Sequence, residues 1–155
     1  MNAVFVTTAI CLAAAGAEAL FAGSRVRDRL RMLRQPSGSP PFVIWAFIGA
    51  AYYAIFFTVL LRALRSNNGV RALIIAITIT VLLLNAVWNF FFFRAKKLAS
   101  AFVLSCVYTV VVLALFAALV PADRVSSVLV GAYAAYLAYA DIWQYRIWQM
   151  NRSVS

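Results

Sequence analysis

The sequence contains no histidine, only two cysteines and only four acidic residues among 155. The missing histidine removes the commonest general base and the commonest metal ligand. Cys11 and Cys106 are too far apart to form a closely spaced metal-binding pair. No serine elbow, phosphate-binding glycine loop or carboxylate pair compensates for these absences. We therefore expect no enzymatic activity, no catalytic or metal-ligating residues and no required cofactor.

Hydrophobic residues, by contrast, make up 66% of the chain, charged residues 12%, and the mean hydropathy is +0.92. A small soluble domain cannot bury that much apolar surface. About 20 apolar residues span a bilayer as a helix, and backbone groups in lipid must be bonded internally. The sequence predicts an all-α integral membrane bundle of five transmembrane helices, forming a single domain over residues 1–155. The spans are 4–22, 42–61, 72–93, 98–120 and 125–143, with a long first loop at 24–41.

Positive charge is concentrated at one end of this predicted bundle. Ten of the 14 basic residues fall in the first loop, the third loop and the C-terminal segment, and four fall in the other two loops. The positive-inside rule then places the N-terminus outside and the C-terminus in the cytoplasm. Anionic lipid headgroups would be attracted to this basic face. The sequence has no basic module apart from the membrane spans, so we do not expect nucleic-acid binding. A compact chain without a presequence fits a bacterial cytoplasmic membrane.

The first loop and the small residues carry further structural signals. Residues 25–34 alternate arginine with apolar residues and predict a short amphipathic helix in the headgroup region. Small residues recur every four positions in the first span and in the fifth span. They are Ala15, Ala19 and Gly23, then Ser127, Gly131 and Ala135. This spacing predicts close helix packing, either within the bundle or at the seam of a homodimer.

The third span holds the most distinctive set of polar and aromatic residues. Asn85, Trp88, Asn89 and Phe92 share one helical face. Carboxamides at membrane depth should point into the bundle or into a wet cavity. They indicate either interhelical hydrogen bonds or one wall of a binding site.

The fifth span carries aromatic residues that allow two interpretations. They are Tyr133, Tyr136, Tyr139 and Trp143, and Tyr52 and Tyr53 in the second span resemble them. Their rings combine a flat apolar surface with a polar group. They could line a slot for a planar ligand or form ordinary core, with Trp143 and Trp148 as interfacial anchors.

Glu18 and Asp141 are the two acids at membrane depth, where a charge is unfavourable. Asp141 lies within reach of Arg146, so we expect these two to form a structural pair. Glu18 has no partner visible in the sequence, and we expect it to be protonated and hydrogen-bonded or to touch a ligand.

Several of these motifs together resemble the TspO/MBR family, the translocator protein and tryptophan-rich sensory protein family. The resemblance covers residues 23–151. Its most specific part is Leu84-Asn85-x-x-Trp88 followed by Phe92-Phe93-x-Ala95-Lys96. The proline segment 36–41 and the ending Trp148-x-x-Asn151 also resemble family patterns, as do Tyr53, Tyr133 and Tyr136.

This resemblance implies a membrane receptor or transporter that binds a tetrapyrrole, either protoporphyrin IX or haem, and in some members a sterol. It also implies a pocket within the bundle, capped by the first loop. The ligand-binding residues that carry over are Tyr53, Asn85, Trp88, Phe92, Tyr133 and Tyr136. A mitochondrial outer membrane is the alternative location that the family suggests.

The chain departs from the family pattern at three tryptophan positions. Gly38, Gly49 and Tyr136 stand where family members usually have tryptophan. The light-driven porphyrin breakdown linked to some members is therefore not expected here. The departures leave open a second function, that of a regulatory or scaffold protein without ligand transport.

Overall fold

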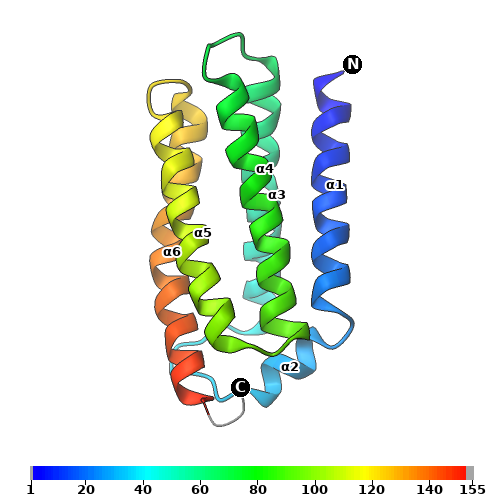
Figure 1. Ribbon diagram of the computed structural model, residues 1–155, viewed down its shortest axis with the longest axis vertical. Coiled ribbons are helices and arrows are strands. Elements are labelled where there is room, and N and C mark those ends of the chain that lie inside the picture. The colour runs from blue at the N-terminus through cyan, green and yellow to red at the C-terminus, as the bar shows by residue number, and fades with distance from the viewer. Residues whose placement is uncertain (1, 153–155) are drawn as a thin grey trace.

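The structure is a computed structural model that describes residues 2–152, and its long helices run side by side (Figure 1). The helices are α1 (Ala3–Ala22), α2 (Val26–Met32), α3 (Phe42–Arg65), α4 (Arg71–Asn89), the π-helix η1 (Phe90–Arg94), α5 (Leu98–Leu119) and α6 (Arg124–Met150). Within this range, five helices are long and apolar enough to cross a membrane, with α4 and η1 together forming one of them. The predicted all-α membrane bundle is confirmed.

Two helices run further than the sequence predicted. α3 continues from 61 to Arg65, and α6 continues from 143 to Met150. The polar residues after Trp143 suggested the end of a span, but a helix that leaves the bilayer keeps its internal backbone bonds. The added turns of α6 bury Gln144 and Ile147 against the rest of the bundle.

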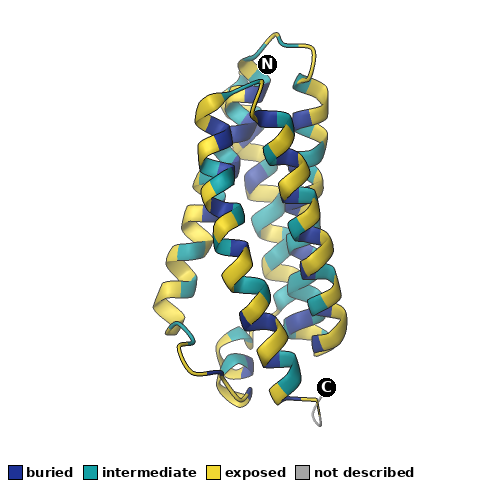
Figure 2. Ribbon diagram, turned by 90° about the vertical axis from the view of Figure 1, so that its left-hand side faces the viewer, coloured by how far each residue is buried: buried dark blue, intermediate teal, exposed yellow. Residues whose placement is uncertain are grey.

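The helices α3, α4, α5 and α6 form the main bundle, and α1 packs at one edge against α3 and α4 (Figure 1). Only Thr7 and Cys11 of α1 are buried. Exposed residues cover the outward faces of the helices (Figure 2), and many of them are large and apolar, such as Phe5 and Leu12. An apolar exterior of this kind is what a bilayer requires.

Small residues serve different purposes in α6 and α1. A β-carbon added to Gly131 would lie 3.0 Å from the Phe116 ring of α5, which confirms the predicted close packing at this position. Gly23, in contrast, ends α1 with φ of +75° in open space. Gly23 therefore does not pack within the bundle, and its positive φ is a backbone conformation that glycine adopts readily at a helix end; a role at a homodimer seam stays a prediction.

The first loop contains the predicted short helix, α2, and is then tied to α6. The Asn151 side chain accepts a hydrogen bond from the Arg34 backbone N–H at 3.0 Å and donates one to the Arg34 carbonyl at 3.1 Å. Tyr139 donates to the Gly38 carbonyl, and the Trp143 Nε1 donates to Ser39 Oγ at 2.9 Å. These bonds hold the loop across one end of the bundle.

Asp123 joins α3 and α6 at the opposite end. Its side chain caps α6 by accepting from the Val125 backbone N–H, and it forms a two-bond ion pair with Arg62 of α3 at 2.6 and 2.7 Å. The hydrogen-bonded Arg62 guanidinium holds the pKa of the Asp123 carboxyl well below its usual range.

Replacing Asp123 by alanine should lower the free energy of unfolding by about 1–2 kcal/mol, because the helix cap and the ion pair are both lost. Asp123→Asn keeps a capping oxygen and should lose less. Since the folded-state pKa is depressed, the stabilisation by the charge is fully present at neutral pH and declines progressively as the pH falls through the usual carboxyl range toward the folded-state pKa. Thermal unfolding in detergent at pH 7 and pH 3 tests this. An equal gap between wild type and Asp123→Asn at both pH values would contradict it.

Candidate functional site

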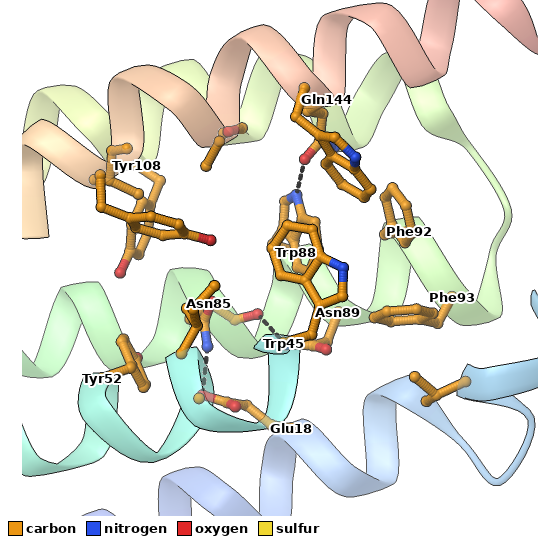
Figure 3. Close-up of a pocket in the computed structure, with 18 of the residues that line it drawn as sticks. Glu18, Trp45, Tyr52, Asn85, Trp88, Asn89, Phe92, Phe93, Tyr108 and Gln144 are labelled. Atoms are coloured by element: carbon orange, nitrogen blue, oxygen red, sulfur yellow. Dashed lines mark hydrogen bonds between the residues drawn. The ribbon is translucent and has the colours of Figure 1, made fainter. Parts of the chain in front are cut away.

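A cavity of about 320 Å³ opens inside the bundle, toward the end that the first loop covers (Figure 3). Its volume lies in the range of small-molecule sites. Residues from α1, α2, α3, α4, η1, α5 and α6 line it. They include Glu18, Val26, Leu30, Trp45, Gly49, Tyr52, Asn85, Trp88, Asn89, Phe92, Phe93, Tyr108, Tyr133, Tyr136, Ala140, Trp143 and Gln144.

Five of the six ligand-binding residues predicted from the sequence lie around this cavity. They are Asn85, Trp88, Phe92, Tyr133 and Tyr136. The sixth, Tyr53, lies outside the lining, and its neighbour Tyr52 takes that place. The two rings meet edge to face with centroids 4.9 Å apart. Consecutive helical residues point about 100° apart, and Tyr53 was selected through the family resemblance, since the spacing alone favours neither tyrosine.

The α1 side of the cavity carries a small polar network (Figure 3). The Asn85 Nδ2 donates to the Glu18 carboxyl at 2.7 Å, and the Asn89 Nδ2 donates to the Asn85 carbonyl at 2.9 Å. Glu18 thus has the interhelical partner that the sequence did not reveal. The amides point into the bundle, as expected for carboxamides at membrane depth.

The opposite side of the cavity carries an amide that sequence reasoning missed. Trp88 Nε1 donates to Gln144 Oε1 at 2.9 Å, which fixes the orientation of the Gln144 side chain (Figure 3). Gln144 is only 3% exposed, and its Nε2 is buried without a hydrogen-bond partner. This N–H group is therefore available to an acceptor on a bound molecule. Its spacing from Tyr133, Tyr136 and Ala140 on one helical face was the available signal.

Aromatic rings form flat walls around the cavity. Trp88 stacks on Phe92 with centroids 4.9 Å apart and ring planes 20° apart. Trp143 lies next to both Phe92 and Trp45, at 6.0 and 4.7 Å. Phe92 belongs to the π-helical turn, a distortion that is frequent at functional sites. Trp45 was not among the residues predicted from the sequence, and Trp143 was predicted to be either a cavity wall or an interfacial anchor.

The tyrosines close the inner end of the cavity. The hydroxyls of Tyr108 and Tyr133 share a hydrogen bond of 2.8 Å, and the buried Tyr52 ring lies 5.9 Å from the Tyr133 ring. The Tyr52 hydroxyl is buried without a hydrogen-bond partner. This end therefore offers apolar ring surface with a few fixed polar atoms.

Asp141 does not pair with Arg146, contrary to the sequence-based expectation. Its carboxyl accepts hydrogen bonds from Ser105 and from Thr109 of α5, the latter at 2.7 Å. Arg146 is exposed, and its position five residues later on the helix points it well away from Asp141. Two hydroxyls one turn apart on α5 satisfy the carboxyl without a second charge.

The chemical character of the site is that of an apolar slot with a few convergent polar groups, which is the usual form of a small-molecule site. Within residues 2–152, no group of three histidine, cysteine or acidic side chains is close enough to hold a metal ion. The slot offers an amide and carboxyl pair on one side and a free amide N–H on the other.

Comparison with models of known protein families gives a match over most of the chain. The model of the TspO/MBR family matches residues 7–149, most of the chain and all of the cavity-lining residues. No curated protein matches the sequence.

Proposed function

This chain belongs to the TspO/MBR family, and from that premise we propose that it is a membrane receptor or transporter for a flat, hydrophobic ligand held inside the helix bundle. The ligand we propose is a tetrapyrrole, either protoporphyrin IX or haem, with a sterol as the next candidate. The observation that supports this proposal most is the cavity, where the stacked Trp88 and Phe92 rings lie beside Asn85 and Gln144.

The driving force would come mainly from the aromatic walls. Burying apolar surface contributes about 25 cal/mol per Å², before the entropy lost on binding is subtracted. The polar atoms of Asn85 and Gln144 would then orient the ligand within the slot. Haem iron would find no histidine in this chain, so a haem would be held by its ring surface or by another type of ligand.

The proposed function is non-enzymatic, and its setting is a bacterial cytoplasmic membrane. The basic end of the bundle, which contains α2 and the C-terminal end of α6 (Figure 1), would face the cytoplasm and anionic lipids. The N-terminus would face outward.

Filling the cavity should weaken ligand binding strongly. Ala140 lines the cavity, whereas Ala138 on the same helix is exposed on the outside. Ala140→Phe should weaken protoporphyrin IX binding at least tenfold, because the new ring occupies the space of the ligand, and Ala138→Phe should leave it unchanged. Titration of purified protein in lipid nanodiscs, followed by the porphyrin absorption band, measures both. Equal affinities for the two variants and wild type would remove the cavity as the binding site.

One observation favours a second function, that of a regulatory or scaffold protein. Such a protein could act as a monomer or as a homodimer. Gly49 lines the cavity and contributes no side chain where the family usually has tryptophan. A site that lacks this ring offers less stacking surface to a ligand. The absence of saturable porphyrin binding together with a stoichiometric co-purifying protein would favour this alternative.

A further inference from the structure

Arg29 is a buried cation in the helix that covers the cavity. It lies in α2 and is only 8% exposed, whereas Arg25, Arg27 and Arg31 around it are exposed. Its Nε and Nη2 atoms are buried and have no hydrogen-bond partner. Burial also lowers the pKa of the Arg29 guanidinium below its usual value. These two nitrogen atoms have lost water without gaining a hydrogen bond.

The acidic side chains of the chain do not neutralise Arg29. Glu18 is bonded to Asn85, and Asp141 is bonded to the α5 hydroxyls. The ion pair found within residues 2–152 uses Asp123. The fourth acid, Asp28, is exposed, and its side chain leaves α2 about 100° away from that of Arg29. The unsatisfied guanidinium therefore lacks an anion among the side chains.

The position of Arg29 connects it to the candidate site. Val26 and Leu30, three residues before it and one after it on α2, line the cavity, whereas Arg29 itself lies next to this lining and is not part of it. Leu33, four residues further on, is buried in the cluster that contains Phe92 and Trp143. Arg29 thus belongs to the face of α2 that is turned toward the bundle, at the end of the cavity that the first loop covers.

We propose that Arg29 is an oxyanion-binding subsite that receives a carboxylate of the molecule in the cavity. A guanidinium presents two parallel N–H groups that match the two oxygens of a carboxylate, and such charge-assisted bonds are strong. The identity of the carboxylate rests on the proposed function, since a ring system held between Trp88 and Tyr136 could extend acidic side arms toward α2. A lipid phosphate offers the same chemistry, so the experiment separates the two sources.

The experiment compares protoporphyrin IX, which has two carboxylates, with its uncharged dimethyl ester. Wild type in nanodiscs of zwitterionic lipid should bind the diacid roughly ten- to a hundredfold more tightly than the ester. Arg29→Met should bind the two equally, and its ligand-free form should melt no lower than wild type because an unsatisfied buried charge has been removed. Arg31→Met, the same charge change at an exposed position of α2, should retain the preference of wild type.

A second arm replaces a third of the zwitterionic lipid by phosphatidylglycerol and measures the melting temperature without porphyrin. In one outcome, wild type shows no preference for the diacid, and the anionic lipid stabilises wild type and Arg31→Met but not Arg29→Met. The subsite then exists, and its anion is a lipid phosphate. This second arm still tests the subsite if neither porphyrin binds. That result would refute the porphyrin as the ligand and would leave the anion-binding role of Arg29 to be decided by the lipid measurement. Identical behaviour of Arg29→Met and wild type in both arms would overturn the subsite.

Discussion

Replacing Asn85 by leucine should lower the free energy of unfolding by about 1–3 kcal/mol and loosen α1 from the bundle. An interhelical hydrogen bond in a membrane protein contributes only about 0.6 kcal/mol on average. The larger loss expected here comes from Glu18, whose partly buried carboxyl would lose the Asn85 donor at 2.7 Å. α1 has few other attachments, since only Thr7 and Cys11 are buried. Thermal unfolding and the hydrogen exchange of α1 amides measure the two effects.

A double-mutant cycle identifies the origin of that loss. Combining Glu18→Leu with Asn85→Leu removes both polar partners. The free energy of unfolding of this double variant should therefore be closer to that of wild type than the value for Asn85→Leu alone. If adding Glu18→Leu instead lowers stability further, the unsatisfied carboxyl is not the cause, and Asn85 acts through packing.

The predictable parts of the fold and of the site were those for which a lipid environment permits only one type of structure or one side-chain orientation. Span length and hydropathy fixed the five helices, because a lipid environment admits few alternatives. Asn85 and Trp88 were predicted to share an inward face because a carboxamide is unfavourable against lipid. The family pattern gave the same two residues.

The differences between the prediction and the structure have a common physical origin, which is that periodicity along one helix does not show what the neighbouring helix presents. Tyr53 was selected, whereas the adjacent Tyr52 lines the cavity beside Tyr133 of α6. Asp141 was assigned to Arg146 from sequence proximity, whereas its partners are hydroxyls of α5. The burial of Arg29 could not be foreseen either, because an arginine in a loop is ordinarily solvated.

Trp88 should have the largest effect of any single residue on the site, because it is both a wall of the cavity and the partner of Gln144. Its ring stacks on Phe92, and its Nε1 fixes the Gln144 amide at 2.9 Å. Trp88→Leu should destabilise the fold by about 3–5 kcal/mol, since a large side chain is truncated and the Gln144 carbonyl oxygen loses its donor. It should also weaken porphyrin binding about tenfold or more, through the lost ring surface and the released amide.

Two variants separate these contributions. Trp88→Phe keeps a smaller ring against Phe92 and loses the donor, so binding should fall less than in Trp88→Leu while Gln144 is still released. Trp148 stacks on Phe102 with centroids 5.6 Å apart and does not line the cavity. Trp148→Leu should therefore lower the melting temperature without changing porphyrin affinity, which the porphyrin absorption band reports independently of the number of tryptophans. An affinity loss in Trp148→Leu equal to that in Trp88→Leu would mean that binding follows general stability, and Trp88 would then have no direct contact with the ligand.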